Sequence, residues 1–163
     1  MKHYDARTYT VQDSVGYLMR HSTSLMREEL EAALANHGFT FVQWVTMMRV
    51  RDNPALTAGD LCRDLHHDSG AFTRVLDQLE ERGLVRRERS EADRRVVLLY
   101  LTPDGRRVVE SLLPIVVGRL NHALAEFSAT EVATLTKLLR RLIARLEGRE
   151  TERGTTPRRS AKA

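Results

Sequence analysis

Cysteine, proline and glycine are all scarce in this chain of 163 residues, which contains one cysteine, four prolines and nine glycines. Cys62 alone cannot form an intrachain disulfide, and the shortage of helix breakers favours long helices. No apolar run approaches the roughly 18 residues that span a bilayer, and the opening MKHYDARTYTVQD lacks the apolar segment of a secretory signal. We therefore expect a cytoplasmic protein with no membrane partner.

The positive charge of the chain is concentrated in two segments. Hydrophobic residues make up 42% and charged residues 29% of the chain, which is typical of soluble globular proteins, and the formal net charge is +4. Residues 82–95 hold six arginines against three carboxylates, and residues 148–163 hold five basic residues against two acidic ones. The pI near 9.6 therefore reflects local basic segments, which suit an anionic partner such as nucleic acid.

Apolar residues recur at helical spacing through most of the chain. Thr40 with Gln43 and Ser128 with Glu131 have the spacing of capping boxes at helix starts, and Gly83 is suited to a left-handed helix stop. The predicted helices cover residues 11–37, 40–52, 58–65, 69–82, 103 towards 127, and 132–148.

Two short strands are predicted, at residues 84–89 and 95–101, with a connecting loop at 90–94. A single hairpin cannot form an independent sheet, so it must pack against the helices that precede it. Two short helices followed by a hairpin describe a helix-turn-helix with a β wing. The predicted fold class is therefore mainly α with a small β-hairpin wing, flanked by N- and C-terminal helices.

This arrangement is physically suited to double-stranded DNA. A helix fits the major groove, and the predicted helix at 69–82 presents serine, threonine, arginine and glutamine on its polar face. The basic loop beside it can reach a minor groove, where the negative potential of narrow tracts favours arginine.

The segment from Leu56 to Val109 resembles the core of the MarR family of winged-helix transcriptional regulators. Its matching motifs are TRVLDQLEERGLV, at the end of the predicted recognition helix, and DRR followed by LYLTPDG in the wing. The resemblance extends more loosely, through helix order and length, to residues 8–147. It implies a homodimer whose two recognition helices and two wings bind a pseudo-palindromic operator, most often as a repressor.

The resemblance also assigns residues to roles. It places groove or phosphate contacts on the recognition helix and in the wing, and it places Arg86 at the wing base, where either a phosphate or a ligand is a suitable partner. We expect Arg94 at the minor groove, whereas Arg95 is a candidate for bracing the loop through an ion pair with Asp93. The predicted DNA-binding residues are Ser69, Thr73, Arg74, Gln78, Arg86, Asp93, Arg94 and Arg95. A surface ion pair between Arg74 and Asp77 is the alternative for Arg74.

Three parts of the chain are expected to have different tasks. Residues 1–38 and 103–147 would form the helical dimerisation region, because their helices carry more apolar surface than the small winged domain can cover. Residues 39–102 would form the DNA-binding domain. Residues 148–163 would be a basic, disordered tail, either solubilising or adding non-specific DNA affinity.

Many members of this family are released from DNA by small aromatic acids. A cation beside an aromatic wall would suit such a ligand. The candidate ligand-binding residues are Arg20, His21, Trp44, Met48 and Arg49. For Trp44, a plain core position is the alternative.

Other chemistries find little support in the sequence. No metal site or cofactor is expected, because His66 and His67 are adjacent and no Cys/His cluster surrounds them. No catalytic motif is present, so an enzyme is not expected. Two alternatives stay open: a redox-responsive regulator that switches through Cys62, which is otherwise a packing residue, and a winged-helix module that binds an acidic protein partner.

Overall fold

The structure is a computed structural model that describes residues 2–53, 56–64 and 69–154, and of these the side chains of 64, 69 and 149–154 are left undescribed. The chain forms two compact units, Met1–Ala123 and Leu124–Ala163. The first unit contains five helices and three strands. They are α1 (Val15–Ala35), α2 (Phe41–Asp52), β1 (Leu56–Thr57), α3 (Ala58–Asp64), α4 (Ser69–Glu81), β2 (Val85–Arg89), β3 (Val97–Leu101) and α5 (Pro103–Ala123).

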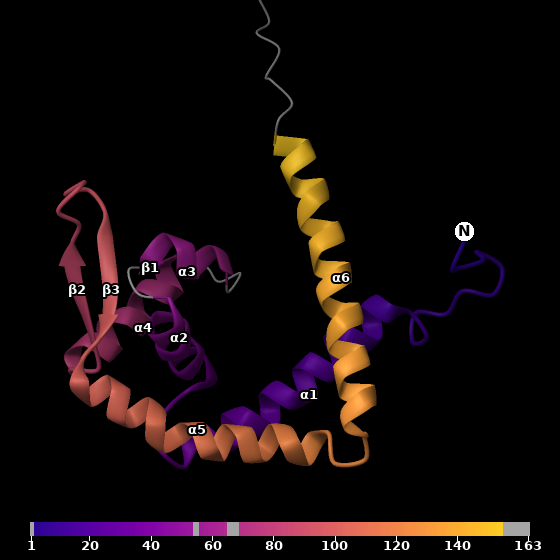
Figure 1. Cartoon of the computed structure of the whole chain (residues 1–163), viewed down its shortest axis with the longest axis horizontal. Coiled ribbons are helices and arrows are strands. Elements are labelled where there is room, and N and C mark those ends of the chain that lie inside the picture. The colour runs from indigo at the N-terminus through magenta and orange to yellow at the C-terminus, as the bar shows by residue number, and fades with distance from the viewer. Residues whose placement is uncertain (1, 54–55, 65–68, 155–163) are drawn as a thin grey trace, which may run out of the picture. The chain divides into compact units, whose positions relative to one another are not determined.

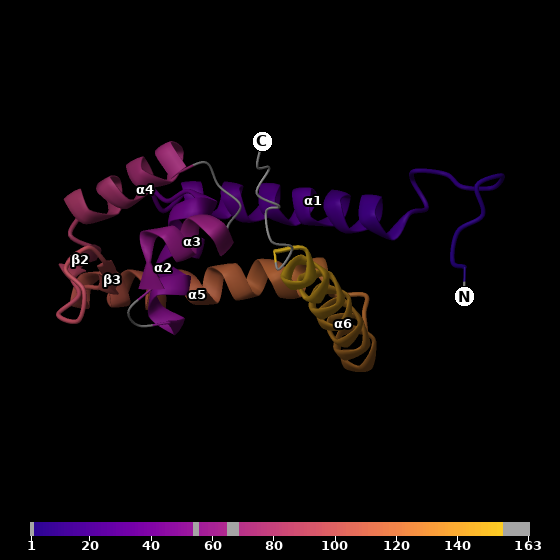
Figure 2. The same cartoon turned by 90° about the horizontal axis from the view of Figure 1, so that it is seen from above.

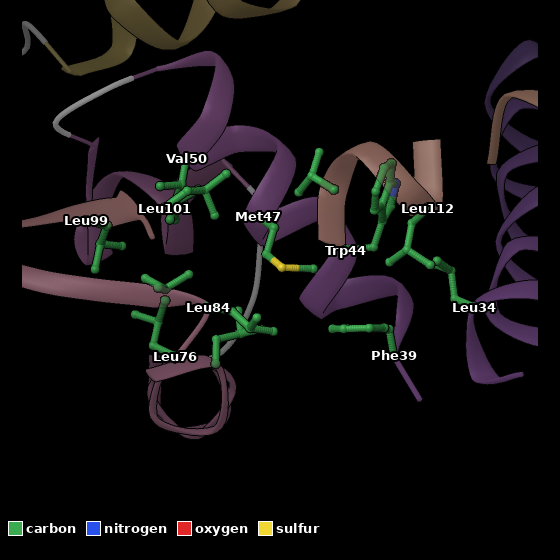
Figure 3. Packing of buried hydrophobic residues seen from close by; sticks show 14 of the residues in the cluster. Leu34, Phe39, Trp44, Met47, Val50, Leu76, Leu84, Leu99, Leu101 and Leu112 are labelled. Atoms are coloured by element: carbon green, nitrogen blue, oxygen red, sulfur yellow. The ribbon is translucent and has the colours of Figure 1, made fainter. Parts of the chain in front are cut away.

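Helix α2 lies at the centre of the first unit. Helices α1, α4 and α5 and strand β3 all pack against it, and α2, α3, α4 and the sheet gather around the N-terminal end of α5 (Figure 1; Figure 2). Trp44, Met47 and Val50 of α2 are buried. Figure 3 shows them between the leucines of the sheet on one side and Leu34 of α1 and Leu112 of α5 on the other. A single hydrophobic cluster therefore joins every layer of this unit.

The sheet has three strands, in the order β1-β3-β2, and all neighbours are antiparallel. Strands β2 and β3 confirm the predicted hairpin, although β3 begins at Val97, two residues later than expected. The sequence did not predict β1, in which Leu56 pairs with Leu99 and Thr57 with Leu98. Two residues are too few to display the period-two alternation that identifies a strand.

Local sequence signals set the helix ends. Thr40 and Gln43 form the predicted capping box at the start of α2, and Gly83 has the predicted positive φ, of 67°. At the start of α3 the hydroxyl and the backbone N–H of Thr57 donate to the carboxylate of Asp60, and the Asp60 N–H donates back to the hydroxyl at 3.0 Å. The two hydrogen bonds from Thr57 hold the pKa of Asp60 below its usual value.

Helix α5 begins where its backbone comes very close to Leu84, the residue before β2. The hydroxyl of Thr102 caps the helix by accepting from the N–H of Gly105 at 3.0 Å. A Cβ atom on Gly105 would lie 2.0 Å from the carbonyl oxygen of Leu84, so only glycine fits at this position. The helix continues through Pro114 and ends at Ala123, before the expected end near Phe127.

The second unit consists of α6 (Ala129–Gly154) and the turn that precedes it. The helix starts at the predicted capping box, in which the Glu131 N–H donates to the Ser128 hydroxyl at 3.3 Å and the Ser128 N–H donates to the Glu131 carboxylate at 2.8 Å. It continues six residues beyond Gly148, where we expected the tail to begin. Within the described residues, no helix has the length and hydrophobicity needed to cross a membrane.

The contact at Gly105 makes a direct stability prediction. Gly105→Ala should lower the free energy of unfolding by about 2–3 kcal/mol, because the added methyl group overlaps backbone that cannot move away. Gly118→Ala in the same helix meets no atom within 4 Å and should be stabilising by about 0.8 kcal/mol through helix propensity. Urea denaturation of both variants measures the difference, and equal effects would contradict the close approach.

Candidate nucleic-acid interface

Helix α4 has one face in the core and one face in solvent. Phe72, Leu76 and Leu79 are buried, which fixes the rotation of the helix about its axis. Thr73 and Arg74 are exposed on the other side, as the predicted contact surface requires. The predicted Ser69 is the first residue of α4, but its side chain lies outside the described residues.

Arg87 of β2 fixes α4 to the sheet and was not predicted. Its guanidinium contacts the carboxylates of Asp77 at 2.6 Å and Glu80 at 3.0 Å, both on α4. Asp77 is therefore paired across elements with Arg87 and not with Arg74, which was the alternative for Arg74. The sequence spacing gave no signal for this contact, because Arg87 lies ten residues beyond Asp77.

Gln78 connects α4 to the start of α2. Its side-chain carbonyl accepts a hydrogen bond of 3.0 Å from the amide of Gln43, and Gln43 is only 6% exposed. Gln43 also belongs to the capping box of α2. Gln78 remains at the exposed surface of α4, but one of its polar groups is already bound within the protein.

The turn of the wing, the hairpin of β2, β3 and the loop 90–96, is held by backbone hydrogen bonds. The Asp93 carboxylate accepts from the backbone N–H of Arg95 at 2.9 Å, and the Asp93 carbonyl accepts from the N–H of Val96, also at 2.9 Å. The expected bracing by Asp93 is therefore present, but the donor is the Arg95 backbone, so the ion pair that we considered for the Arg95 side chain is absent from the described contacts. The side chain of Arg95 is exposed.

Four arginines lie on α4 and the wing, two elements in contact with each other, and have no partner of opposite charge in the part of the chain that the structure describes. Each of them is exposed and forms no ion pair there; they are Arg74, Arg89, Arg94 and Arg95. Arg89 and Arg94 line an open hollow of about 410 Å³ together with Ser90 and Glu91. Arg89 was not among the predicted site residues, although its place at the end of β2, beside the loop, could have suggested it.

Arg86 lies at the base of the wing, apart from this group. Its guanidinium lies over the ring of Tyr100 at 4.9 Å from the ring centroid and pairs with Glu88. Strand side chains alternate between faces, so Arg86 points to the sheet face opposite that of Arg87, which contacts α4. Of the predicted DNA contacts, Arg86 is thus the one on the other side of the sheet.

The five predicted ligand-binding residues are not gathered around one cavity. Arg20 and His21 are exposed and lie beside Tyr17, with the His21 ring stacked on it at 5.7 Å. Trp44 is 4% exposed within the core, and Met48 is packed against that core. Arg49 is half-buried on α2.

A different set of residues lines a cavity of about 420 Å³ between α1, α2 and α5. Arg27 is at its edge, with the guanidinium 5.7 Å from the centroid of the Phe41 ring. No ion pair of Arg27 occurs with any described residue. The remaining lining residues are mostly apolar: Thr23, Met26, Leu30, Val42, Val45 and Leu120. This cavity offers an apolar space with one cation, which is the chemistry that the sequence analysis assigned to other residues.

The remaining candidates for site chemistry are Cys62 and the side chains that could bind a metal ion. Cys62 is half-buried and packs against the core. The described residues contain no group of three or more His, Cys, Asp or Glu side chains that could hold a metal ion. His66 and His67 lie outside the described residues.

Comparisons with known proteins agree with this geometry. The model of the MarR family matches residues 37–96, from the start of α2 into the wing. The organic hydroperoxide resistance transcriptional regulator of Bacillus subtilis is 30% identical over 105 residues, which cover 64% of this chain and 71% of the relative.

Solved structures match over a longer part of the chain. A structure of BpsR from Bordetella bronchiseptica, whose DNA binding is regulated by 6-hydroxynicotinic acid, superposes with a TM-score of 0.72 at 27% identity, covering 82% of this chain and 96% of that one. The MarR family protein Rv2887 of Mycobacterium tuberculosis, in complex with salicylic acid, gives a TM-score of 0.68 at 27% identity, covering 79% and 96%.

Arg87 and Arg89, two residues apart on β2, should differ in their effect on stability. Arg87→Ala should lower the free energy of unfolding by about 1 kcal/mol, because it removes the ion pairs that hold α4 to the sheet. Arg89→Ala should change it by less than about 0.5 kcal/mol, since that side chain is exposed and has no ion-pair partner among the described residues. Equal losses in chemical denaturation would show that Arg87 does not hold α4.

Proposed function

Because this chain belongs to the MarR family of winged-helix, DNA-binding transcriptional regulators, we propose that it is a homodimeric repressor of a pseudo-palindromic operator and that a small aromatic acid releases it. The observation that carries the proposal is the group of exposed arginines on α4 and the wing that form no ion pair within the described chain. These positive charges can therefore pair with an external anion, and the phosphate groups of DNA are such anions.

Helix α4 is the proposed recognition helix. Its buried face and the contacts of Arg87 with Asp77 and Glu80 hold the helix in place. A helix that recognises bases must be held in a fixed position. Thr73 and Arg74 are exposed at its surface and are proposed to contact bases or phosphates. The amide N–H groups of Gln78 are proposed to donate to the DNA, since its carbonyl already accepts one hydrogen bond, from Gln43.

The wing is proposed to carry the second contact. Asp93 shapes the turn through the backbone of Arg95, so Asp93 acts on DNA only by holding the loop. Arg94 and Arg95 are then free to extend towards a minor groove. Arg89, beside Arg94 at the same hollow, is added to the predicted set as a phosphate contact.

The proposed dimer rests on apolar surface that the single chain leaves exposed. Val15, Leu18 and Leu25 of α1 are each about half exposed. Helix α6 exposes another row of large apolar residues, Leu135, Leu138, Ile143 and Leu146. A folded monomer seldom leaves so many large apolar side chains in water, so we propose that residues 1–38 and 103–147 meet their counterparts in a second copy, while residues 39–102 bind DNA.

The proposed ligand site is the cavity between α1, α2 and α5. The cavity volume of about 420 Å³ falls within the usual range of small-molecule sites. Arg27 can pair with a carboxylate while the ring of Phe41 packs against an aromatic ligand. BpsR and Rv2887 are both associated with small aromatic acids, which supports this ligand class.

A DNA-binding experiment tests the two contact elements. The first requirement is an operator, selected from a random DNA pool with the full chain. Replacing both Arg94 and Arg95 with Ala should weaken operator binding and reduce the salt slope of log Kd by about 1 for each phosphate that the variant no longer binds. Thr73→Ala and Arg74→Ala should instead lower the ratio of specific to non-specific binding, by about 1–3 kcal/mol for each base contact.

The matched control for these variants is Arg107→Ala. Arg107 is an exposed arginine of α5 that pairs with Asp104, and its replacement should leave the operator affinity unchanged. Sedimentation of the complex should give two chains per operator. Unchanged affinity in the wing double variant would exclude the wing contact, and selection of no DNA at all would favour a protein-binding module.

The ligand site is tested by release from DNA with salicylate as the probe. Arg27→Met keeps the apolar bulk of the side chain but removes its charge. The salicylate concentration that releases half of the protein from DNA should therefore rise by about tenfold or more, as expected when a charged hydrogen bond is removed. Arg20→Met, also on α1 but away from the cavity, should behave as wild type. The opposite order would return the site to the residues predicted from sequence, and no release of the wild-type protein would contradict the ligand class.

A further inference from the structure

A small cavity lies where the end of α2, the base of the wing and the start of α5 meet. It has a volume of about 130 Å³ and is lined by Val50, Arg51, Arg86, Tyr100, Leu101 and Arg106. The three arginines come from three elements: Arg51 from the end of α2, Arg86 from the base of the wing and Arg106 from the first turns of α5. We refer to this set of six residues as the arginine cavity.

Three guanidinium groups around so small a space repel one another unless negative charge compensates them. Arg51 pairs with Asp52 at 2.8 Å, and Arg86 pairs with Glu88. Arg106 is exposed and forms no ion pair with any residue that the structure describes. The arginine cavity therefore retains one uncompensated positive charge.

The existing ion pairs leave room for an external anion. The side chains of Asp52 and Glu88 are 51% and 46% exposed, and such surface pairs are weak and easily exchanged. The Arg86 guanidinium also contacts the ring of Tyr100, at 4.9 Å from its centroid, and a guanidinium can donate two parallel N–H groups to one oxyanion. All three arginines line the same cavity, so one anion there lies next to all three.

The lining of the cavity indicates the kind of ligand. Three of its six lining residues are arginines, and its volume is about 130 Å³. A tetrahedral oxyanion fits such a space and can accept from several guanidinium groups at once. A phosphate group also matches the fork geometry of arginine better than a monovalent halide does.

We propose that the arginine cavity binds a phosphate group of a small molecule, at a site separate from both the DNA-binding surface and the aromatic-ligand cavity. Its position argues against the DNA backbone as the source of the phosphate. Arg86 pairs in register with Tyr100, next to Val85 and Leu101 at the end of the hairpin far from its turn, and on the face opposite α4. A phosphate bound there joins α2, the wing base and α5, and so stiffens the attachment of the wing.

The test is calorimetric titration of the full chain with inorganic phosphate at constant ionic strength. The wild-type protein should bind one phosphate per chain with saturation. Arg106→Met and Arg51→Met should each weaken binding by about tenfold or more, because each removes a charged hydrogen bond. Arg107→Met, the next residue of α5 and one that does not line the cavity, should bind phosphate as the wild type does. Thermal unfolding without phosphate checks that each variant is folded.

Two results would overturn the proposal. The first is the absence of saturable binding to the wild type, or an equal loss in the Arg106→Met and Arg107→Met variants. The second comes from DNA titrations: a salt slope lower by about 1 in Arg106→Met would assign the cavity to a phosphate of the DNA backbone, whereas an unchanged slope supports a small-molecule phosphate. Because these variants leave α4 and the wing loop intact, failure of phosphate binding alone would not affect the proposed DNA-binding function.

Discussion

The burial of α2 is the constraint on which the rest of the structure depends. Trp44, Met47 and Val50 are almost inaccessible to water, and α1, α4, α5 and β3 all pack against this one helix. One hydrophobic core is therefore shared by elements that have different proposed roles. The proposed DNA-binding elements, the proposed ligand cavity and the arginine cavity all pack on this core.

This shared core explains how α4 can be rigid while its outer surface stays available. The buried leucines set its rotation, and Arg87 neutralises Asp77 and Glu80 on the side towards the sheet. Carboxylates that would otherwise attract Arg74 are thereby occupied. The positive charge of α4 and the wing is left exposed for an anionic partner, and this division of the arginines between structural and free roles is the main electrostatic feature of the molecule.

The proposed ligand cavity and α4 are connected by a short chain of contacts. Phe41 and Val42 line the cavity and stand at the start of α2, next to the capping box. Gln43 of that box donates to Gln78 on α4. A ligand that shifts the first turn of α2 would therefore act on α4, the proposed recognition helix, through this part-buried hydrogen bond.

The sequence by itself determined the capped starts of α2 and α6, the stop at Gly83, the β2–β3 hairpin and the family, because these depend on residues close together in the chain. It placed the start of α1 at residue 11, whereas Ser14 caps this helix and Val15 begins it. It did not predict β1, whose two residues form a strand only where Leu98 and Leu99 of β3 are brought beside them. It considered an ion pair between Asp93 and the side chain of Arg95, whereas the Asp93 carboxylate accepts from the backbone N–H of Arg95. Only the tertiary structure decided that Arg87 rather than Arg74 pairs with Asp77, that Arg27 rather than Arg20 lines the cavity, and that Arg51, Arg86 and Arg106 meet. Such choices depend on atoms a few ångströms apart on different elements, and spacing along the chain does not set those distances.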